Sequence, residues 1–247
     1  MSEHSFSPAW RAQPLGRRGF LRVSAASAAT VALVAATGCD TSTPEPVAPD
    51  PNLITLPAGD NGLLYSLFLL ALAKSTLYQK VYETPPTDLT TAERAIFSDL
   101  RDHEIAYREL LHLLLDPNYL DSTKAVQLFP VDFAFKLTSF TLTTRAGVLA
   151  AAQQLEDLAA ALYPVVVPLV ASSAPYQRVL LLKAASVQAR HAAVVRDLLT
   201  PGSFASDDVV NAAGQLKPRT PVEVNTALAP FFAPYVISVA NLPVPVL

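Results

Sequence analysis

Two short fragments of the chain hold side chains at the spacing of paired metal ligands on a helix. They are Glu104–Tyr107, with the sequence EIAY, and Gln188–His191, with the sequence QARH. Residues three positions apart lie on one face of an α-helix, so a Glu-x-x-His pair can bind a metal ion together. Each fragment keeps half of such a pair, because a tyrosine replaces the histidine in the first and a glutamine replaces the glutamate in the second. The spacing therefore indicates a two-metal site that has lost ligands.

Four segments of the chain carry apolar residues at helical spacing, and no alternating strand pattern stands between them. They cover about residues 61–82, 90–115, 144 to beyond 163, and 174–199. A capping box at Thr90–Glu93 marks the start of the second segment. Pro164 and Pro168 predict a kink or an end in the third, because each ring removes a backbone donor and clashes one turn back.

The connections between these segments predict how the helices are arranged. Short turns join the first segment to the second and the third to the fourth, whereas residues 116–143 separate the two pairs. A connection of that length can cross the whole bundle, so we expect an all-α, ferritin-like four-helix bundle over residues 53–200. Residues 201–247 form a proline-rich tail that we expect to pack on the outside of the bundle. Its expected anchors are Phe231, Phe232 and Tyr235.

A polar residue interrupts the apolar stripe of every predicted helix near its middle. In a bundle of helices of similar length these positions meet at one depth. The predicted layer holds Lys74, Glu104, Tyr107, Glu156, Gln188 and His191. A buried charge without a partner costs several kcal/mol, so such groups must pair with one another or bind a metal ion. The alternative is that one or two stripes are misphased, which would leave Lys74 and Glu156 facing water.

At these residues the sequence resembles the ferritin-like domain of bacterial exported proteins related to plant desiccation-related proteins. The matching stretches are Leu89–Ala106, Leu155–Leu158 and Ala189–Leu199, and the resemblance extends over about residues 53–214. The resemblance implies a two-metal site whose first and third helices each supply a glutamate. The second and fourth helices of that site each supply a Glu-x-x-His pair.

The resemblance carries three metal ligands over to this chain, namely Glu104, Glu156 and His191. The remaining ligand positions are degenerate and hold Ala71 or Lys74, Tyr107 and Gln188. Half of a six-ligand site is therefore missing, and a cation has entered at one of the candidate positions.

The charges of these residues distinguish three forms of the site. Two carboxylates do not balance the four positive charges of two divalent ions, so a di-iron or di-manganese centre ranks last. A single iron, manganese or zinc ion on the three matched ligands ranks second. The form that we expect has no metal cofactor. In it, Lys74 or a protonated His191 pairs with the carboxylates, and Gln188 and Tyr107 complete a hydrogen-bonded network.

The N-terminus has the features of an export signal. Arg17–Arg22 resembles a twin-arginine motif, and the apolar stretch that follows is short for a membrane span. That stretch ends in Ala36–Cys39, which resembles a lipobox, and Cys39 is the only cysteine of the chain. We therefore expect a signal peptide over residues 1–38, a lipid on Cys39 and a proline-rich tether over residues 39–52.

Export by the Tat pathway would place the chain in the cell envelope as a lipoprotein, on the periplasmic or extracytoplasmic side. Its expected partner is the membrane, through the N-terminal lipid. The residues after the signal include 14 basic and 20 acidic side chains, a net charge of −6, which argues against nucleic-acid binding. No feature of the sequence indicates an oligomeric state.

Three functions follow from these observations. The first, which we favour because three ligands are missing, is a membrane-tethered ferritin-like protein without catalytic activity that serves as a scaffold or interaction module. The alternative is a residual metal-binding protein, in redox chemistry or metal storage, that uses Glu104, Glu156 and His191 with iron or manganese. A third is a small-molecule binder that uses the emptied centre of the bundle as a pocket.

Overall fold

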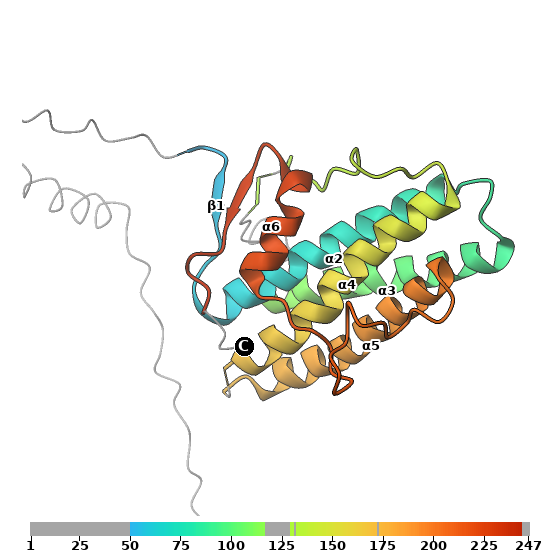
Figure 1. Ribbon diagram of the computed structural model, residues 1–247. Helices are drawn as coiled ribbons and strands as arrows, with labels where there is room; N and C mark the ends of the chain where they lie inside the picture. The colour runs from blue at the N-terminus through green and yellow to red at the C-terminus, as the bar shows by residue number, and fades with distance from the viewer. Residues whose placement is uncertain (1–49, 117–128, 131, 172, 244–247) are drawn as a thin grey trace, which may run out of the picture. The chain divides into compact units, whose positions relative to one another are not determined.

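Four helices of 25 residues each form the body of the described part of the chain (Figure 1). The computed structural model describes residues 50–116, 129–130, 132–171 and 173–243. The helices are α2 (Gly59–Glu83), α3 (Thr91–Leu115), α4 (Arg145–Leu169) and α5 (Pro175–Leu199). Helix α2 pairs with α3 and α4 pairs with α5, each pair antiparallel, which confirms the predicted ferritin-like helical bundle. The predicted signal peptide, Cys39 and almost all of the predicted tether lie outside the described residues.

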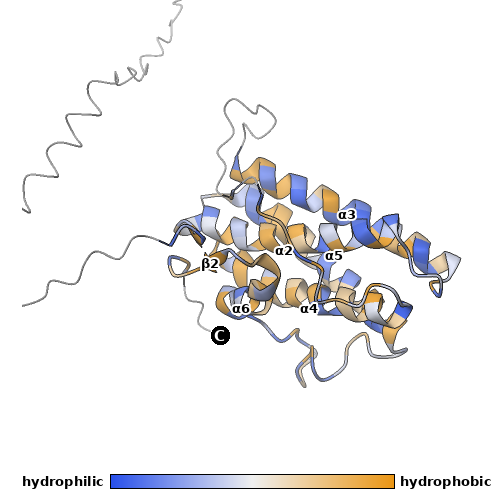
Figure 2. Ribbon diagram, turned by 90° about the horizontal axis from the view of Figure 1, so that it is seen from above, coloured by the Kyte–Doolittle hydropathy of each residue, from blue (hydrophilic) through white to orange (hydrophobic). Residues whose placement is uncertain are grey.

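Helices α2 and α4 form the centre of the bundle, because their sequences are apolar nearly all round. Fifteen residues of each are buried, against five of α3 and seven of α5. In Figure 2, α2 is mostly hydrophobic, whereas hydrophobic and hydrophilic residues alternate around α3. Because α2 and α4 are apolar on nearly all sides, other parts of the chain must also pack against the faces that do not contact another long helix. Among the described residues, none of the helices is long and apolar enough to cross a membrane.

The helix ends follow the sequence signals, with one exception. The predicted capping box at Thr90 is present, since its side chain accepts from the Glu93 backbone and Glu93 accepts from the Thr90 backbone. Helix α4 continues through Pro164, where the sequence predicts a kink or an end, and it ends at Leu169, directly after Pro168. Both prolines are exposed and lie four residues apart on one face, where the backbone carbonyls can turn toward water. Valines between the prolines stay buried and hold the helix to the core.

An aromatic cluster joins the long crossover to the C-terminal part of the chain. The described residues of the crossover run lengthwise beside the bundle to the start of α4 (Figure 1). Phe133 stacks on Phe232 with ring centroids 5.0 Å apart, and Phe135 stacks on Phe231 at 4.9 Å. Tyr235 donates a hydrogen bond of 2.5 Å to Asp132. The predicted anchors of the tail therefore contact the bundle through the crossover.

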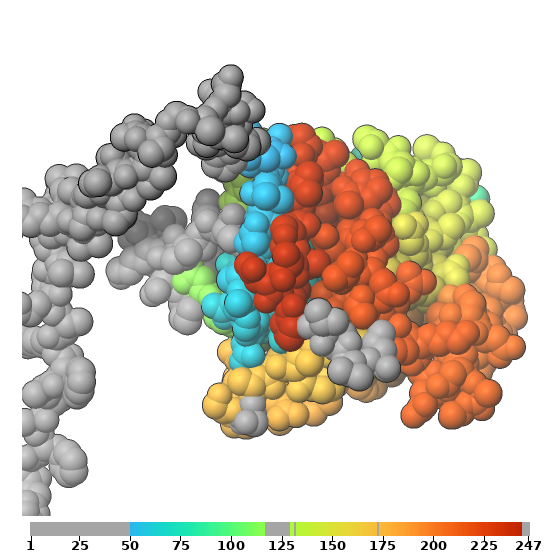
Figure 3. Space-filling model, turned by 60° about the vertical axis from the view of Figure 1, so that its left-hand side comes forward, coloured from blue at the N-terminus to red at the C-terminus, as the bar shows by residue number. Residues whose placement is uncertain are grey.

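The predicted tail contains two elements that the sequence reading missed. Helix α6 (Pro221–Phe232) begins with a capping box at Thr220, and strand β2 (Val236–Ser238) pairs in parallel with β1 (Leu53–Thr55). The parallel register places Ile54 opposite Ile237, and both side chains are buried. Figure 3 shows the C-terminal residues packed beside β1 over the bundle. Helix α6 contacts both α2 and α4, and β2 contacts α6, so the C-terminal elements pack onto the two central helices through α6.

Replacing Phe232 by alanine is expected to lower the free energy of unfolding by about 3–5 kcal/mol. The side chain is 0% exposed and lies at the centre of the aromatic cluster. Urea denaturation of the full chain measures the loss. The matched control is Phe204→Ala, since Phe204 is 58% exposed and its removal should change stability by about 0.5 kcal/mol or less. Equal, small losses for both variants would contradict an integral role for the C-terminal elements.

Candidate functional site

Six buried polar side chains from all four long helices meet in the middle of the bundle. We call them the polar layer: Lys74 and Tyr78 of α2, Glu104 of α3, Glu156 of α4, and Gln188 and His191 of α5. None is more than 7% exposed. The prediction that polar residues on four stripes meet at one depth is confirmed for five of these six. The alternative in which Lys74 and Glu156 face water is wrong.

Lys74 occupies the centre of the polar layer. Its Nζ lies 3.0 Å from Oε1 of Glu104 and 3.1 Å from Oε2 of Glu156. It also donates a hydrogen bond to Oε1 of Gln188. An ammonium group has three N–H donors, so this side chain uses its full capacity on groups from three other helices. The positive charge therefore lies between the two carboxylates, where a shared metal ion would otherwise bind.

The carboxylate of Glu104 accepts hydrogen bonds at one oxygen only. Its Oε1 lies 3.1 Å from Nε2 of Gln188 and 3.0 Å from Nδ1 of His191, in addition to the lysine. Its Oε2 is buried and accepts no hydrogen bond from the described residues. Because a carboxylate only accepts, Nδ1 of His191 must carry the proton of this bond. In neutral His191 the lone pair therefore belongs to Nε2, on the other side of the ring.

Glu156 completes the polar layer through a tyrosine. Its Oε1 accepts a hydrogen bond of 2.6 Å from the hydroxyl of Tyr78, which is 0% exposed. Tyr78 was not among the residues predicted for the layer, and Tyr107 was predicted to complete the hydrogen-bonded network instead. That assignment is wrong, because Tyr107 is half-buried and its hydroxyl bonds to none of the described side chains of the layer. The position of Tyr78, one turn after Lys74 on the same face of α2, is the sequence feature that could have identified it as the tyrosine of the layer.

The charges of the layer leave one negative charge uncompensated when His191 is neutral. Burial tends to raise the pKa of Glu104, but Lys74 and His191 outweigh burial and lower it. For Glu156 burial prevails over the attraction of Lys74, so its pKa is raised. Burial alone would lower the pKa of Lys74, but the two carboxylates raise it. The lysine therefore stays charged at neutral pH, and Glu156 is the carboxyl that takes up a proton first.

An exposed histidine extends the layer to the surface. Nδ1 of His103 lies 3.2 Å from Nε2 of His191, and the ring planes are within 5° of each other. His103 directly precedes Glu104 on α3 and was not among the residues predicted for the layer. Ala71, which the resemblance offered besides Lys74 as the degenerate ligand position of the first helix, is 3% exposed and belongs to the hydrophobic core.

The three residues predicted as metal ligands do come together. One ligand atom each from Glu104, Glu156 and His191 lie within 4.8 Å of one another, a possible set for one iron or manganese ion. Lys74 is bonded to two of these three residues, so its ammonium shares the space that such an ion requires. A centre with two metal ions does not fit these residues, because no third carboxylate belongs to the polar layer.

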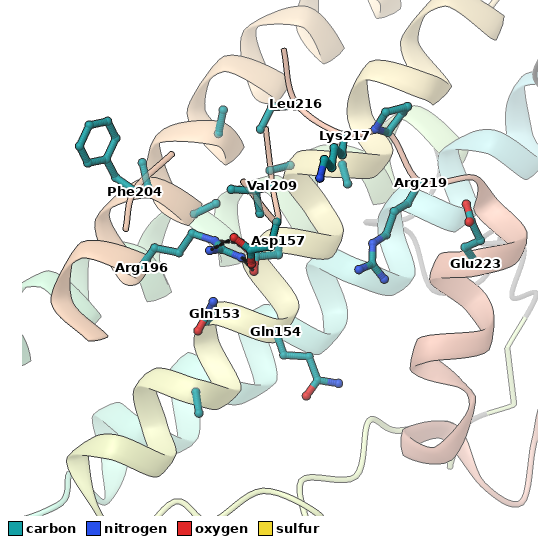
Figure 4. Close-up of a pocket in the computed structure, with 18 residues that line it drawn as sticks. Gln153, Gln154, Asp157, Arg196, Phe204, Val209, Leu216, Lys217, Arg219 and Glu223 are labelled. Carbon is teal, nitrogen blue, oxygen red and sulfur yellow. Dashed lines mark hydrogen bonds and ion pairs between the residues drawn. The ribbon is translucent and has the colours of Figure 1, made fainter. Parts of the chain in front are cut away.

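A separate cavity of about 690 Å³ lies between α4, α5 and residues 204–219. Figure 4 shows Arg196 joined to Asp157 among the lining residues, with Gln154 and Arg219 also lining the cavity. Arg196 also binds Asp208, and this contact, with a further hydrogen bond from Ser206, lowers the pKa of Asp208 to about 2. No residue of the polar layer lines this cavity. The centre of the bundle is itself filled by Lys74, so a small-molecule pocket there has no support among the described residues.

Replacing Lys74 by methionine is expected to lower the free energy of unfolding at pH 7 by about 3–5 kcal/mol, because two buried carboxylates then lose their counter-charge. Lys80→Met on the exposed side of α2 is the matched control and should cost about 0.5 kcal/mol or less. Urea denaturation of both variants measures these losses.

The loss in Lys74→Met should shrink between pH 7 and about pH 5. Without the lysine, burial and mutual repulsion raise both carboxyl pKa values in the folded state above those of the unfolded chain. The folded variant then binds more protons than the unfolded one, so its stability rises as the pH falls. A loss independent of pH would contradict the assignment of Lys74 as the counter-ion.

Comparison with known proteins agrees with the fold. The family model described as a ferritin-like domain matches residues 62–201, which include α3, α4, α5, all but the first three residues of α2, and the whole polar layer. Searches of curated proteins and of solved structures give no significant match. Since the matched segment covers more than half of the chain, this protein belongs to the ferritin-like domain family.

Proposed function

We propose that this chain is a membrane-tethered, exported ferritin-like protein that has exchanged its metal centre for a lysine and acts as a non-catalytic scaffold or interaction module. One observation carries the proposal. The Lys74 ammonium lies 3.0 and 3.1 Å from the carboxylates of Glu104 and Glu156, which are the expected metal ligands. An ammonium group links the helices as an ion would, but it has no redox states and no open coordination position.

Energetics favour the lysine over an ion at this position. A divalent cation between the carboxylates would have to expel an ammonium that is 1% exposed and fully hydrogen-bonded. The displaced charge would then need another partner in the core, because an unpaired buried charge costs several kcal/mol. Gln188 adds to this preference, since its amide oxygen accepts from Lys74 while its amide nitrogen donates to Glu104.

Metal content after expression with added Fe²⁺ and Mn²⁺ tests the proposal. The wild-type chain is expected to hold far less than one equivalent by elemental analysis. Lys74→Glu is expected to gain metal, because it removes the ammonium and adds a third carboxylate to Glu104, Glu156 and His191. The control Lys74→Glu with Glu156→Gln should lose that gain. Near-stoichiometric metal in the wild type that is lost in Glu156→Gln would overturn the proposal.

The export and tethering part of the proposal is supported by the sequence. Arg17–Arg22 resembles a twin-arginine motif, and Cys39, the only cysteine, follows an apolar stretch directly. Strand β1 begins at Leu53, so the proline-rich residues before it are the length of chain available as a tether. A lipid on Cys39 would hold the helical domain at the membrane surface.

Cys39→Ala is expected to move the protein from the membrane fraction to the soluble fraction, because the lipid is the proposed anchor. Cell fractionation with radiolabelled palmitate measures both the location and the modification. Ser42→Ala, in the same predicted tether, is the matched control and should remain labelled and membrane-bound. Retention of unlabelled Cys39→Ala in the membrane fraction would show that another part of the chain provides the anchor.

The second candidate function is a residual metal-binding redox or storage protein. The observation in its favour is the convergence of Glu104, Glu156 and His191 within 4.8 Å. It requires Lys74 to leave the centre when an ion binds. It also requires that His191→Ala abolish iron or manganese binding in the wild-type background, which the same elemental analysis measures.

A further inference from the structure

We propose that His103 and His191 form a cation site on the outer side of the polar layer, which binds one nitrogen-preferring divalent ion such as Zn²⁺. This site is distinct from the carboxylate centre, because it uses neither Glu156 nor Lys74. Its only ligand in common with that centre is His191, through the ring nitrogen that points away from the lysine, and Glu104 orients that ring from behind. The inference does not rest on the proposed function.

The distance between the two histidines fits a shared ion. Nδ1 of His103 and Nε2 of His191 are 3.2 Å apart, and the ring centroids are 5.3 Å apart. Two imidazole nitrogens bound to one tetrahedral zinc ion, each at about 2.0–2.1 Å, are separated by about 3.3–3.4 Å. Nε2 of His191 accepts this contact as a hydrogen bond from Nδ1–H of His103. When the exposed His103 ring carries its proton on Nε2 instead, a small turn of the ring aims both lone pairs at one ion.

The hydrogen bond on the inner side prepares His191 as a ligand. Nδ1 of His191 donates to Oε1 of Glu104 at 3.0 Å, which fixes the tautomer and leaves the lone pair on Nε2. A carboxylate behind a metal-binding histidine is a common arrangement that orients the ring and strengthens the ligand. Glu104 is itself held by Lys74 and Gln188, so the inner histidine is preorganised by the whole layer.

The surroundings of the pair are open to solvent, and an acidic residue lies one turn away on α3. His103 is exposed, so an ion can enter from solvent and water can complete its coordination. Asp99 is also exposed and precedes His103 by one turn of α3, a spacing that places both residues on one face of the helix. Two imidazoles with coordination completed by water form a ligand set that suits zinc, with cobalt as its spectroscopic substitute.

Titration of the full chain, purified without a histidine tag, with Zn²⁺ in a calorimeter tests the proposal. We expect one ion per chain in the wild type, and Co²⁺ should give the visible absorption of a tetrahedral site. His103→Asn should weaken binding by about tenfold or more, because one of two imidazoles is lost while the buried layer stays intact. Glu104→Gln should weaken it by about 10–100-fold, as expected for the group behind a ligand.

Two control variants separate this site from its alternatives. His112→Asn removes a histidine elsewhere on α3, and Glu156→Gln removes a carboxylate of the inner centre, so both should bind zinc like the wild type. Circular dichroism verifies that each variant is folded. Absence of zinc binding, or binding unchanged in His103→Asn, would overturn this inference alone. Binding lost in Glu156→Gln but kept in His103→Asn would place the ion among the carboxylates and overturn the proposed function as well.

Discussion

The ion pair between Lys74 and two carboxylates is the interaction on which the centre of this bundle depends. One ammonium group, contributed by α2, binds Glu104 of α3, Glu156 of α4 and Gln188 of α5. Every long helix therefore brings a polar group to the core, and each such group would be costly to bury alone. The same four positions in a two-metal protein would surround cations. Here a side chain of the protein supplies the positive charge, and no loading step is needed.

The remaining charge balance explains how the layer connects to the surface. Two carboxylates and one ammonium leave a net charge of −1, and the Glu104 carboxylate accepts a hydrogen bond from Nδ1 of His191. The opposite nitrogen of His191 then faces the exposed ring of His103. Lys74 thus occupies the centre of the polar layer, while the same hydrogen-bonded network orients the unprotonated ring nitrogen of His191 toward the surface. The proposed loss of the inner metal centre and the proposed outer ligand pair both follow from one arrangement.

The sequence predicted the polar layer because helical spacing is a strong constraint when four stripes carry a polar residue at the same depth. It did not separate Tyr78 from Tyr107, since both lie close to their stripes and only packing decides which hydroxyl reaches Glu156. Helix α4 continues through Pro164, whose exposure to water the apolar residues around it did not reveal. Strands β1 and β2 are three residues long, too short for an alternating pattern, but the capping box at Thr220 could have revealed α6.

A crystal structure of the protein grown with Mn²⁺, with an anomalous difference map, tests the central claim most directly. The account predicts continuous density for Lys74 between Glu104 and Glu156, with Nζ within hydrogen-bonding distance of both, and no anomalous peak at that position. An anomalous peak about 2.0–2.2 Å from the two carboxylates, with the Lys74 side chain turned away, would contradict it.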